Sequence, residues 1–242
     1  MLAAMIATYI NSIAVIVGAL LGLVIGKRLK DQFKEVVFTA SGLVTIVIGM
    51  QMALGTTSYL VLLFAIVIGG FIGYAIGIEQ AILSLGEWIE RRTMRGNLAV
   101  SGGSLFAKGF LNSSVLFCSG AMAVVGSIAA GTKGDYNLIL IKSVMDGCMA
   151  IVFAAAYGPG VLGSAVVILL YQGFFTLAGG WLSPLLGETG LAELSAAGGI
   201  LLLMIGLSLV KIKEFKTGNF LPALILAPLF SRLATWLASL MG

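Results

Sequence analysis

Hydrophobic residues run along this chain in long stretches that charged residues interrupt at only a few places. The uncharged stretches cover residues 1–26, 36–78, 109–132, 147–187 and 194–210. A helix that spans a bilayer needs about 20 consecutive apolar residues, so the two longest stretches must each fold back on themselves. Turn-forming residues stand at the right places for this, at Gly55–Ser58 and at Tyr157–Gly160.

The pattern predicts an all-α, polytopic integral membrane protein with about eight transmembrane helices in a single transmembrane domain, residues 1–242. We expect these helices at residues 3–26, 36–54, 58–78, 109–130, 136–157, 160–182, 193–210 and 219–240. Residues 79–108 form the expected cytoplasmic amphipathic connector, because Ile78, Ile82, Leu85 and Ile89 recur on one face of a helix.

Basic residues give the expected orientation. They cluster after the first, third and seventh predicted spans, within residues 27–34, 91–95 and 211–216. With eight spans these clusters share one side, which the positive-inside rule makes cytoplasmic. Both termini are then predicted to lie outside.

Composition narrows the class of protein. Hydrophobic residues make up 60% and charged residues 10% of the chain, with a mean hydropathy of +1.11, whereas soluble domains carry about 25% charged residues. The chain has no histidine, no glycine-rich phosphate loop and no Cys/His metal cluster. We therefore expect no enzyme activity, no cofactor and no metal. The net charge of +4 does not indicate nucleic acid, because the basic residues flank helices.

Two charges fall inside a predicted span. Lys142 and Asp146 stand four residues apart, on one helical face, where they can neutralise each other. A charge at that depth costs at least about 2.5 kcal/mol on insertion scales, so it usually faces a protein interior or a water cavity. Arg232 is expected at a similar depth in the last span, in contact with Asp146. The three charges sum to +1, which leaves one positive charge for an anionic solute or a mobile proton to balance. The alternative is a structural ion pair, with Lys142 or Arg232 extending toward the interface.

Uncharged polar residues add to this set. Those in the fourth span predict a helix that is locally unwound or lines a cavity, because backbone that faces lipid must stay hydrogen-bonded. The predicted solute-binding residues are Lys142, Ser143, Asp146, Asn112, Ser113, Ser114, Tyr171, Gln172 and Arg232.

Glycines recur at every fourth position in two predicted spans, at Gly18, Gly22 and Gly26 and again within residues 69–77. Such stripes let helix backbones approach closely. They serve either packing within one chain or a homo-oligomer interface.

Two weak internal similarities suggest an inverted repeat. Residues 38–49 resemble residues 195–206, and Tyr9–Ser12 resembles Phe110–Ser113. In each pair the two segments belong to spans of opposite direction, as in many secondary transporters. Glycine-rich apolar helices also resemble one another by chance.

Several of these motifs resemble a known family. The runs Phe117–Ser127, Lys142–Gly147, Tyr171–Gly173 and Asn219–Leu224 are similar to those of the YdfK/YqgA-type bacterial membrane proteins, domain of unknown function 554. The resemblance implies a multi-pass protein of the bacterial cytoplasmic (inner) membrane. It implies no activity.

We therefore expect a transporter of a small solute or ion with a polar site near the membrane midplane, an anion being slightly favoured. Its expected partners are the lipid bilayer and that solute. A passive ion channel with the same lining is one alternative. A structural or regulatory oligomeric membrane protein is another.

Overall fold

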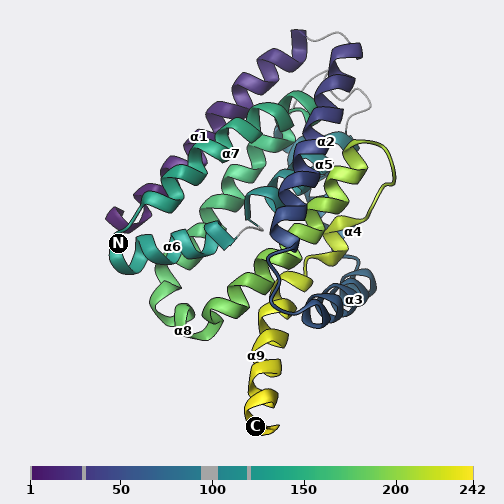
Figure 1. Ribbon diagram of the computed structural model, residues 1–242. Coiled ribbons are helices and arrows are strands. Elements are labelled where there is room, and N and C mark those ends of the chain that lie inside the picture. Colours follow the sequence, from purple (N-terminus) through teal and green to yellow (C-terminus); the bar gives the residue numbers. More distant parts are fainter. Residues whose placement is uncertain (1, 29–30, 94–102, 119–120, 242) are drawn as a thin grey trace.

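Helices account for every regular element that the structure describes. The computed structural model describes residues 2–28, 31–93, 103–118 and 121–241. Its elements are α1 (Leu2–Arg28), α2 (Asp31–Ala53), α3 (Tyr59–Ile76), α4 (Ile78–Thr93), α5 (Gly103–Cys118), α6 (Ala121–Lys133), α7 (Asn137–Tyr157), α8 (Gly160–Leu209), the short 3-10 helix η1 (Thr217–Phe220) and α9 (Ala223–Met241) (Figure 1).

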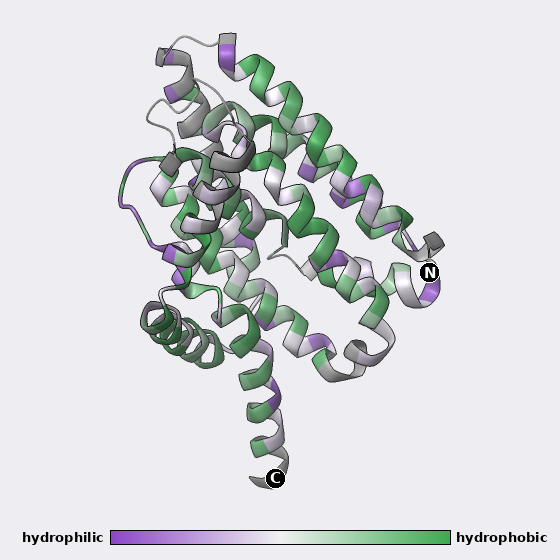
Figure 2. Ribbon diagram, turned by 180° about the vertical axis from the view of Figure 1, so that it is seen from behind, coloured by the Kyte–Doolittle hydropathy of each residue, from purple (hydrophilic) through white to green (hydrophobic). Residues whose placement is uncertain are grey.

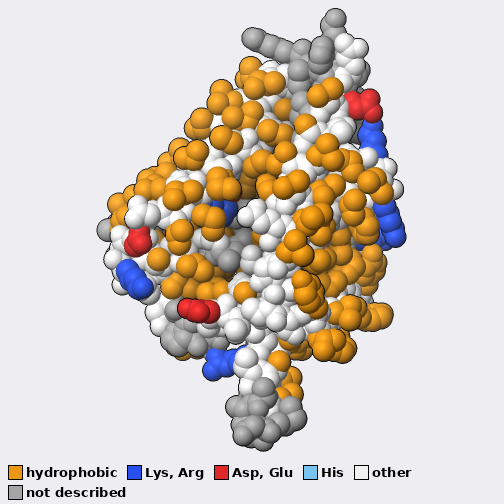
Figure 3. Space-filling view, in the orientation of Figure 1, with side chains coloured by type: hydrophobic (Ala, Val, Ile, Leu, Met, Phe, Trp, Pro, Cys, Tyr) orange, Lys and Arg blue, Asp and Glu red, His pale blue; other side chains and the backbone are white. Residues whose placement is uncertain are grey.

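Six helical segments within these ranges are long and apolar enough to cross a membrane. They are Met5–Lys27, Tyr59–Ile76, Asn137–Tyr157, Gly160–Trp181, Leu186–Leu209 and Thr217–Leu237. The pair α5–α6, bent by 59°, makes a seventh if it is one span, while the apolar part of α2 is shorter. Hydrophobic side chains cover most of the face in Figure 3, and hydrophilic residues concentrate in the segment between α8 and η1 (Figure 2).

Both predicted turns are present. Ser58 caps the N-terminus of α3, where its side chain accepts a hydrogen bond from Val61 N. Gly158 stands between α7 and α8 with φ of 82°, a conformation that favours glycine. Pro222 directly precedes α9, at a position where the missing N–H of proline costs no helical hydrogen bond.

Three predicted segments differ in detail from the structure. The expected spans 160–182 and 193–210 are both present, as Gly160–Trp181 and Leu186–Leu209, and they are joined within α8 at Gly187, where the backbone is not helical. The expected span 109–130 is divided into α5 and α6. The predicted connector is helical from Ile78 to Thr93, and its residues 94–102 lie outside the described residues.

Close glycine contacts hold the helices together. A Cβ atom on Gly18 would overlap Gly147 O, one on Gly22 would overlap Ile151 O, and Gly26 lies against Ala155. The constant offset of these contacts means that α1 and α7 run in the same direction. The first glycine stripe therefore serves packing within the chain.

Candidate functional site

A buried ion pair occupies the middle of α7. Lys142 and Asp146 are 7% and 6% exposed, and Lys142 Nζ donates to Asp146 Oδ1 at 2.7 Å and to Oδ2 at 2.5 Å. The opposite face of the helix carries Ile141 and Val144, both more than half exposed. The two charges therefore face the protein interior and the apolar face is left for lipid. Ser143 is also buried, but its hydroxyl donates to Ile139 O in its own helix.

Asn11 of α1 completes the coordination of the carboxylate. Its Nδ2 donates to Asp146 Oδ2 at 3.1 Å, and its side chain is fully buried. The glycine contacts between α1 and α7 make this approach possible, because α1 could not come as close with larger residues. Asn11 was not among the predicted solute-binding residues, since nothing in the sequence indicates that it faces Asp146, 135 positions away.

Gln172 of α8 is fully buried, and both its Oε1 and its Nε2 lack a hydrogen-bond partner. The Oδ1 atom of Asn11 is in the same state. A buried polar group without a partner costs about 1–3 kcal/mol, so such groups usually meet water or a ligand. The neighbouring Tyr171 is half-buried and packs edge-on against Phe175, with ring centroids 4.9 Å apart.

The expected interruption of the fourth span lies beside this cluster. α5 ends at Cys118, which is buried within electrostatic range of Lys142 and Asp146. Ser119 and Gly120 lie outside the described residues. Ser113 and Ser114 donate to Gly109 O and Phe110 O respectively, so their hydroxyls serve α5 itself.

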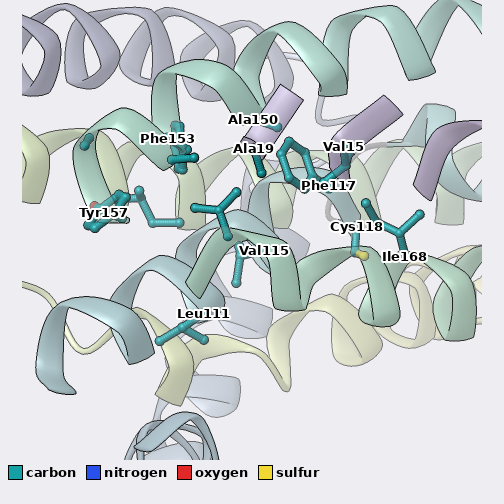
Figure 4. Close-up of a cluster of buried hydrophobic side chains, with 14 of the residues drawn as sticks. Val15, Ala19, Leu111, Val115, Phe117, Cys118, Ala150, Phe153, Tyr157 and Ile168 are labelled. Carbon is teal, nitrogen blue, oxygen red and sulfur yellow. The ribbon is translucent and has the colours of Figure 1, made fainter. Parts of the chain in front are cut away.

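The prediction that Asn112 joins Lys142 and Asp146 was wrong. Its Nδ2 donates to Tyr157 Oη at 2.8 Å, and Tyr157 stands eleven residues beyond Asp146, roughly 16 Å along the helix axis. Buried apolar side chains fill the space between, with Phe153 and Val115 lying between Tyr157 and Cys118 in Figure 4.

Asn112 and Tyr157 instead line a cavity of about 640 Å³. Its mouth carries both signs of charge: Lys108 Nζ lies 3.0 Å from Glu214 Oε1, and Lys211 Nζ lies 3.6 Å from Glu35 Oε1. Lys211 belongs to a basic cluster that the sequence places on the cytoplasmic side. The other residues that line the cavity are Glu79, Leu105, Leu111, Ile205, Ser208, Leu209, Phe215, Lys216 and Thr217.

The predicted contact between Arg232 and Asp146 does not form. Asp146 bonds to Lys142 and Asn11, whereas Arg232 is exposed on α9, which packs against α3 and α8. The residue count placed both side chains at one depth but could not say which way each faced. Lys142 and Asp146 sum to zero, so the expected excess positive charge is absent from the cluster.

Glu193, the first residue of the expected span 193–210, is a buried carboxylate that the sequence analysis did not single out. It is fully buried in α8, and its Oε1 accepts hydrogen bonds from Thr57 N, Thr57 Oγ1 and Ser58 N at 2.6, 2.8 and 3.0 Å. Thr56 Oγ1 contributes a further bond, at 2.7 Å to Oε2. Glu193 therefore ties the turn between α2 and α3 to the second half of α8.

The fold and the inward-facing pair define a polytopic α-helical membrane protein with a buried polar cluster. The chain belongs to the family described as "Protein of unknown function (DUF554)", whose model matches residues 6–232. It is 29% identical to "Uncharacterized membrane protein YdfK" of Bacillus subtilis (strain 168), over 93% of this chain and 94% of that protein. It is 28% identical to "Uncharacterized protein YqgA" of Escherichia coli (strain K12), over 96% and 99% respectively. No solved structure matches the chain significantly.

Removal of the Glu193 carboxylate should loosen the α2–α3 turn. We expect Glu193→Ala to lower the stability by at least about 2 kcal/mol, because each buried hydrogen bond to a charged group contributes about 1.5–3 kcal/mol. Thermal unfolding in detergent measures the change. The matched control is Glu188→Ala, which removes an exposed carboxylate one residue beyond the Gly187 break. Equal melting temperatures for the two variants would contradict this role.

Glu79, at the edge of the cavity, should make stability depend on pH. Burial raises its pKa above 4.5, opposed by a hydrogen bond from Gly218 N at 2.8 Å and by Lys216. The folded state thus binds the proton more tightly than the unfolded state, so ionisation of Glu79 lowers stability as pH rises from 4.5 through the raised pKa. Glu79→Gln keeps the acceptor for Gly218 N. Its melting temperature should exceed that of the wild type at neutral pH, by a margin that shrinks toward pH 4.5. A margin independent of pH would rule the explanation out.

Proposed function

We propose that this protein is a transporter of a small solute or ion across the bacterial cytoplasmic membrane. The observation that carries the proposal is the Lys142–Asp146 pair, held by Asn11 in the middle of α7 and facing inward. Ionisable residues in transmembrane segments are costly to bury, and those that face a bundle interior commonly mark solute or proton pathways. The interrupted α5–α6 pair beside the cluster resembles the discontinuous helices that bind solutes in transporters.

The surroundings of the cluster support a site that opens to one side at a time. The cavity reaches inward as far as Asn112 and Tyr157, and the apolar cluster around Phe117 and Phe153 separates it from Lys142 and Asp146. Glu193 clamps the turn at the opposite ends of α2 and α3. A transport cycle would open either the apolar cluster around Phe117 and Phe153 or the turn held by Glu193, and keep the other closed.

The inverted repeat is part of this proposal. Gly42 lies against Gly206 O and Gly49 against Gly199 O, so α2 and the second half of α8 cross in opposite directions. The sequence similarity aligns Gly42 with Gly199 and Gly49 with Gly206. A two-fold axis through the crossing would exchange the aligned glycines and reproduce both contacts, as expected for inverted-topology repeats.

The charge balance of the cluster bears on the solute. With Arg232 outside it, Lys142 and Asp146 cancel, which favours a solute without net charge or an ion exchanged for another cation. The basic clusters favour a cytoplasmic cavity mouth and termini that lie outside. Homo-oligomerisation through Gly69 and Gly73 is not part of the proposal, because these glycines pack against Ala223 and Asn219 of the same chain.

A structural role is the second candidate. The direct bond between Lys142 and both oxygens of Asp146 favours it, since a satisfied internal pair could simply fix helix register. A passive channel would need a water path where Phe117 and Phe153 now pack.

Water access to the cluster tests the proposal directly. In a background without Cys118 and Cys148, we expect Ser143→Cys to react with a charged, membrane-impermeant methanethiosulfonate reagent. The matched control is Val144→Cys, one residue along α7 but 68% exposed on the apolar face, which should stay unlabelled because the reagent requires water. If neither cysteine is labelled from either side, the pair is sealed and the transport proposal fails.

Flux measurements separate transport from a structural role. Proteoliposomes containing a pH-sensitive dye are screened with amino acids, organic acids and inorganic salts for solute-dependent flux. We expect Asp146→Asn to lower any such flux at least tenfold while the protein remains monodisperse. Arg232→Gln should retain the flux, because Arg232 lies outside the cluster. The structural role would instead be favoured if Asp146→Asn aggregates, while Asp146→Glu folds normally and supports no flux.

A further inference from the structure

The polar layer around Gln172 contains more oxygen atoms than its own hydrogen bonds use. Thr8 and Thr176 are buried, with hydroxyl oxygens 3.5 Å apart, at the long limit of a hydrogen bond. Asn11 Oδ1 and Gln172 Oε1 have no partner. Together with the Asp146 carboxylate, these groups offer hydroxyl, amide and carboxylate oxygens from α1, α7 and α8.

These oxygens belong to adjacent turns of three helices that contact one another. α1 and α8 run in opposite directions, because Thr8 faces Thr176 whereas Ser12 donates to Ala165 O. Asn11 lies between the two contacts on α1, and Gln172 lies between them on α8, one turn from Thr176. Asn11 also reaches Asp146 on α7. The Asn11 amide therefore contacts the ion pair directly, and the Gln172 amide lies one turn from the Thr8–Thr176 contact.

We propose that this layer is a binding site for a monovalent metal cation, with Na⁺ as the probe ion. Amide, hydroxyl and carboxylate oxygens are hard ligands that suit such ions, as do the carbonyl-lined cation sites of transporters. A single carboxylate balances a single positive charge. Among the described residues no group of three or more His, Cys, Asp or Glu side chains could hold a more highly charged metal.

Lys142 occupies the position of the competing cation. Its ammonium contacts both Asp146 oxygens, and a metal cation added beside an intact pair would leave a buried net charge of +1, which is costly. Cation binding therefore requires Lys142 to leave Asp146. The inference deepens the proposed function, because it names the ion that the Lys142–Asp146 pair would exchange.

The competition predicts a specific behaviour of Lys142→Met, which keeps an apolar side chain of similar length and leaves Asp146 without its counter-charge. We expect this variant to melt at a lower temperature than the wild type in N-methylglucamine chloride. Added NaCl at constant ionic strength should restore it in a saturable way, by about 3 °C or more at tenfold excess over the Kd. The wild type should show a smaller shift, and Lys142→Met/Asp146→Asn none.

Gln172→Leu distinguishes a cation ligand from a hydrated amide. If Gln172 binds the ion, this change removes the Na⁺ shift of the Lys142→Met protein. If Gln172 only holds water, the change alters the melting temperature equally in Na⁺, K⁺ and N-methylglucamine, and the proposal is overturned. Gln51→Leu, at an exposed amide of α2, is the matched control and should retain the shift.

These measurements test the cation site and the transport function separately. A Na⁺ shift without flux in proteoliposomes would support the cation site and contradict the transporter. Solute flux that is independent of Na⁺, with no thermal shift in Lys142→Met, would overturn the cation site and leave the transporter standing.

Discussion

The structure depends on keeping one carboxylate ionised or paired deep inside an apolar helix bundle. Asp146 meets this constraint through Lys142 one turn away and Asn11 on a neighbouring helix. Each partner has its own requirement: Lys142 needs the helical register of α7, and Asn11 needs α1 to lie close enough for an amide to reach. The glycine contacts at Gly18 and Gly22 provide that closeness. Backbone packing and buried electrostatics therefore depend on each other here. The glycines that let α1 approach α7 also let Asn11 reach the Asp146 carboxylate.

Around this centre the two ends of the protein differ. One end has a solvent-accessible cavity whose charged mouth residues form loose, exposed pairs. The other end has a fully buried carboxylate held by the backbone and hydroxyl groups of a turn. The cluster lies between them behind large apolar side chains. This asymmetry agrees with the proposed transport function, and it makes water accessibility of the cluster a measurement that would distinguish the candidate functions.

Much of the helical architecture could be predicted from the sequence, because apolar length, turn residues and glycine spacing are local signals. The turns at Gly55–Ser58 and Tyr157–Gly160 and the amphipathic α4 were found in this way, whereas Ser119 and Gly120 of the fourth span lie outside the described residues. The inward orientation of Lys142 and Asp146 could be predicted because a charged side chain that faces lipid has a high free-energy cost. Directions around a helix axis did not follow: Arg232 is exposed on α9 and does not face the pair, and Asn112 lies on a different level from the pair. Glu193 was missed because a hydrophilic residue near a turn is normally solvated, and only the fold shows that the turn closes over it.

Gly187 divides α8 into two arms with different neighbours. Its φ of 62° and ψ of 174° lie in a region open essentially to glycine alone. The first arm packs against α1, α5 and α6 through contacts such as Thr176 with Gly131, whereas the second packs against α2 through Gly199 and Gly206. The longest helix of the protein thus consists of two helical segments joined at one glycine. A side chain at position 187 would meet no neighbouring atom, but it would strain the backbone at this junction, away from the cluster.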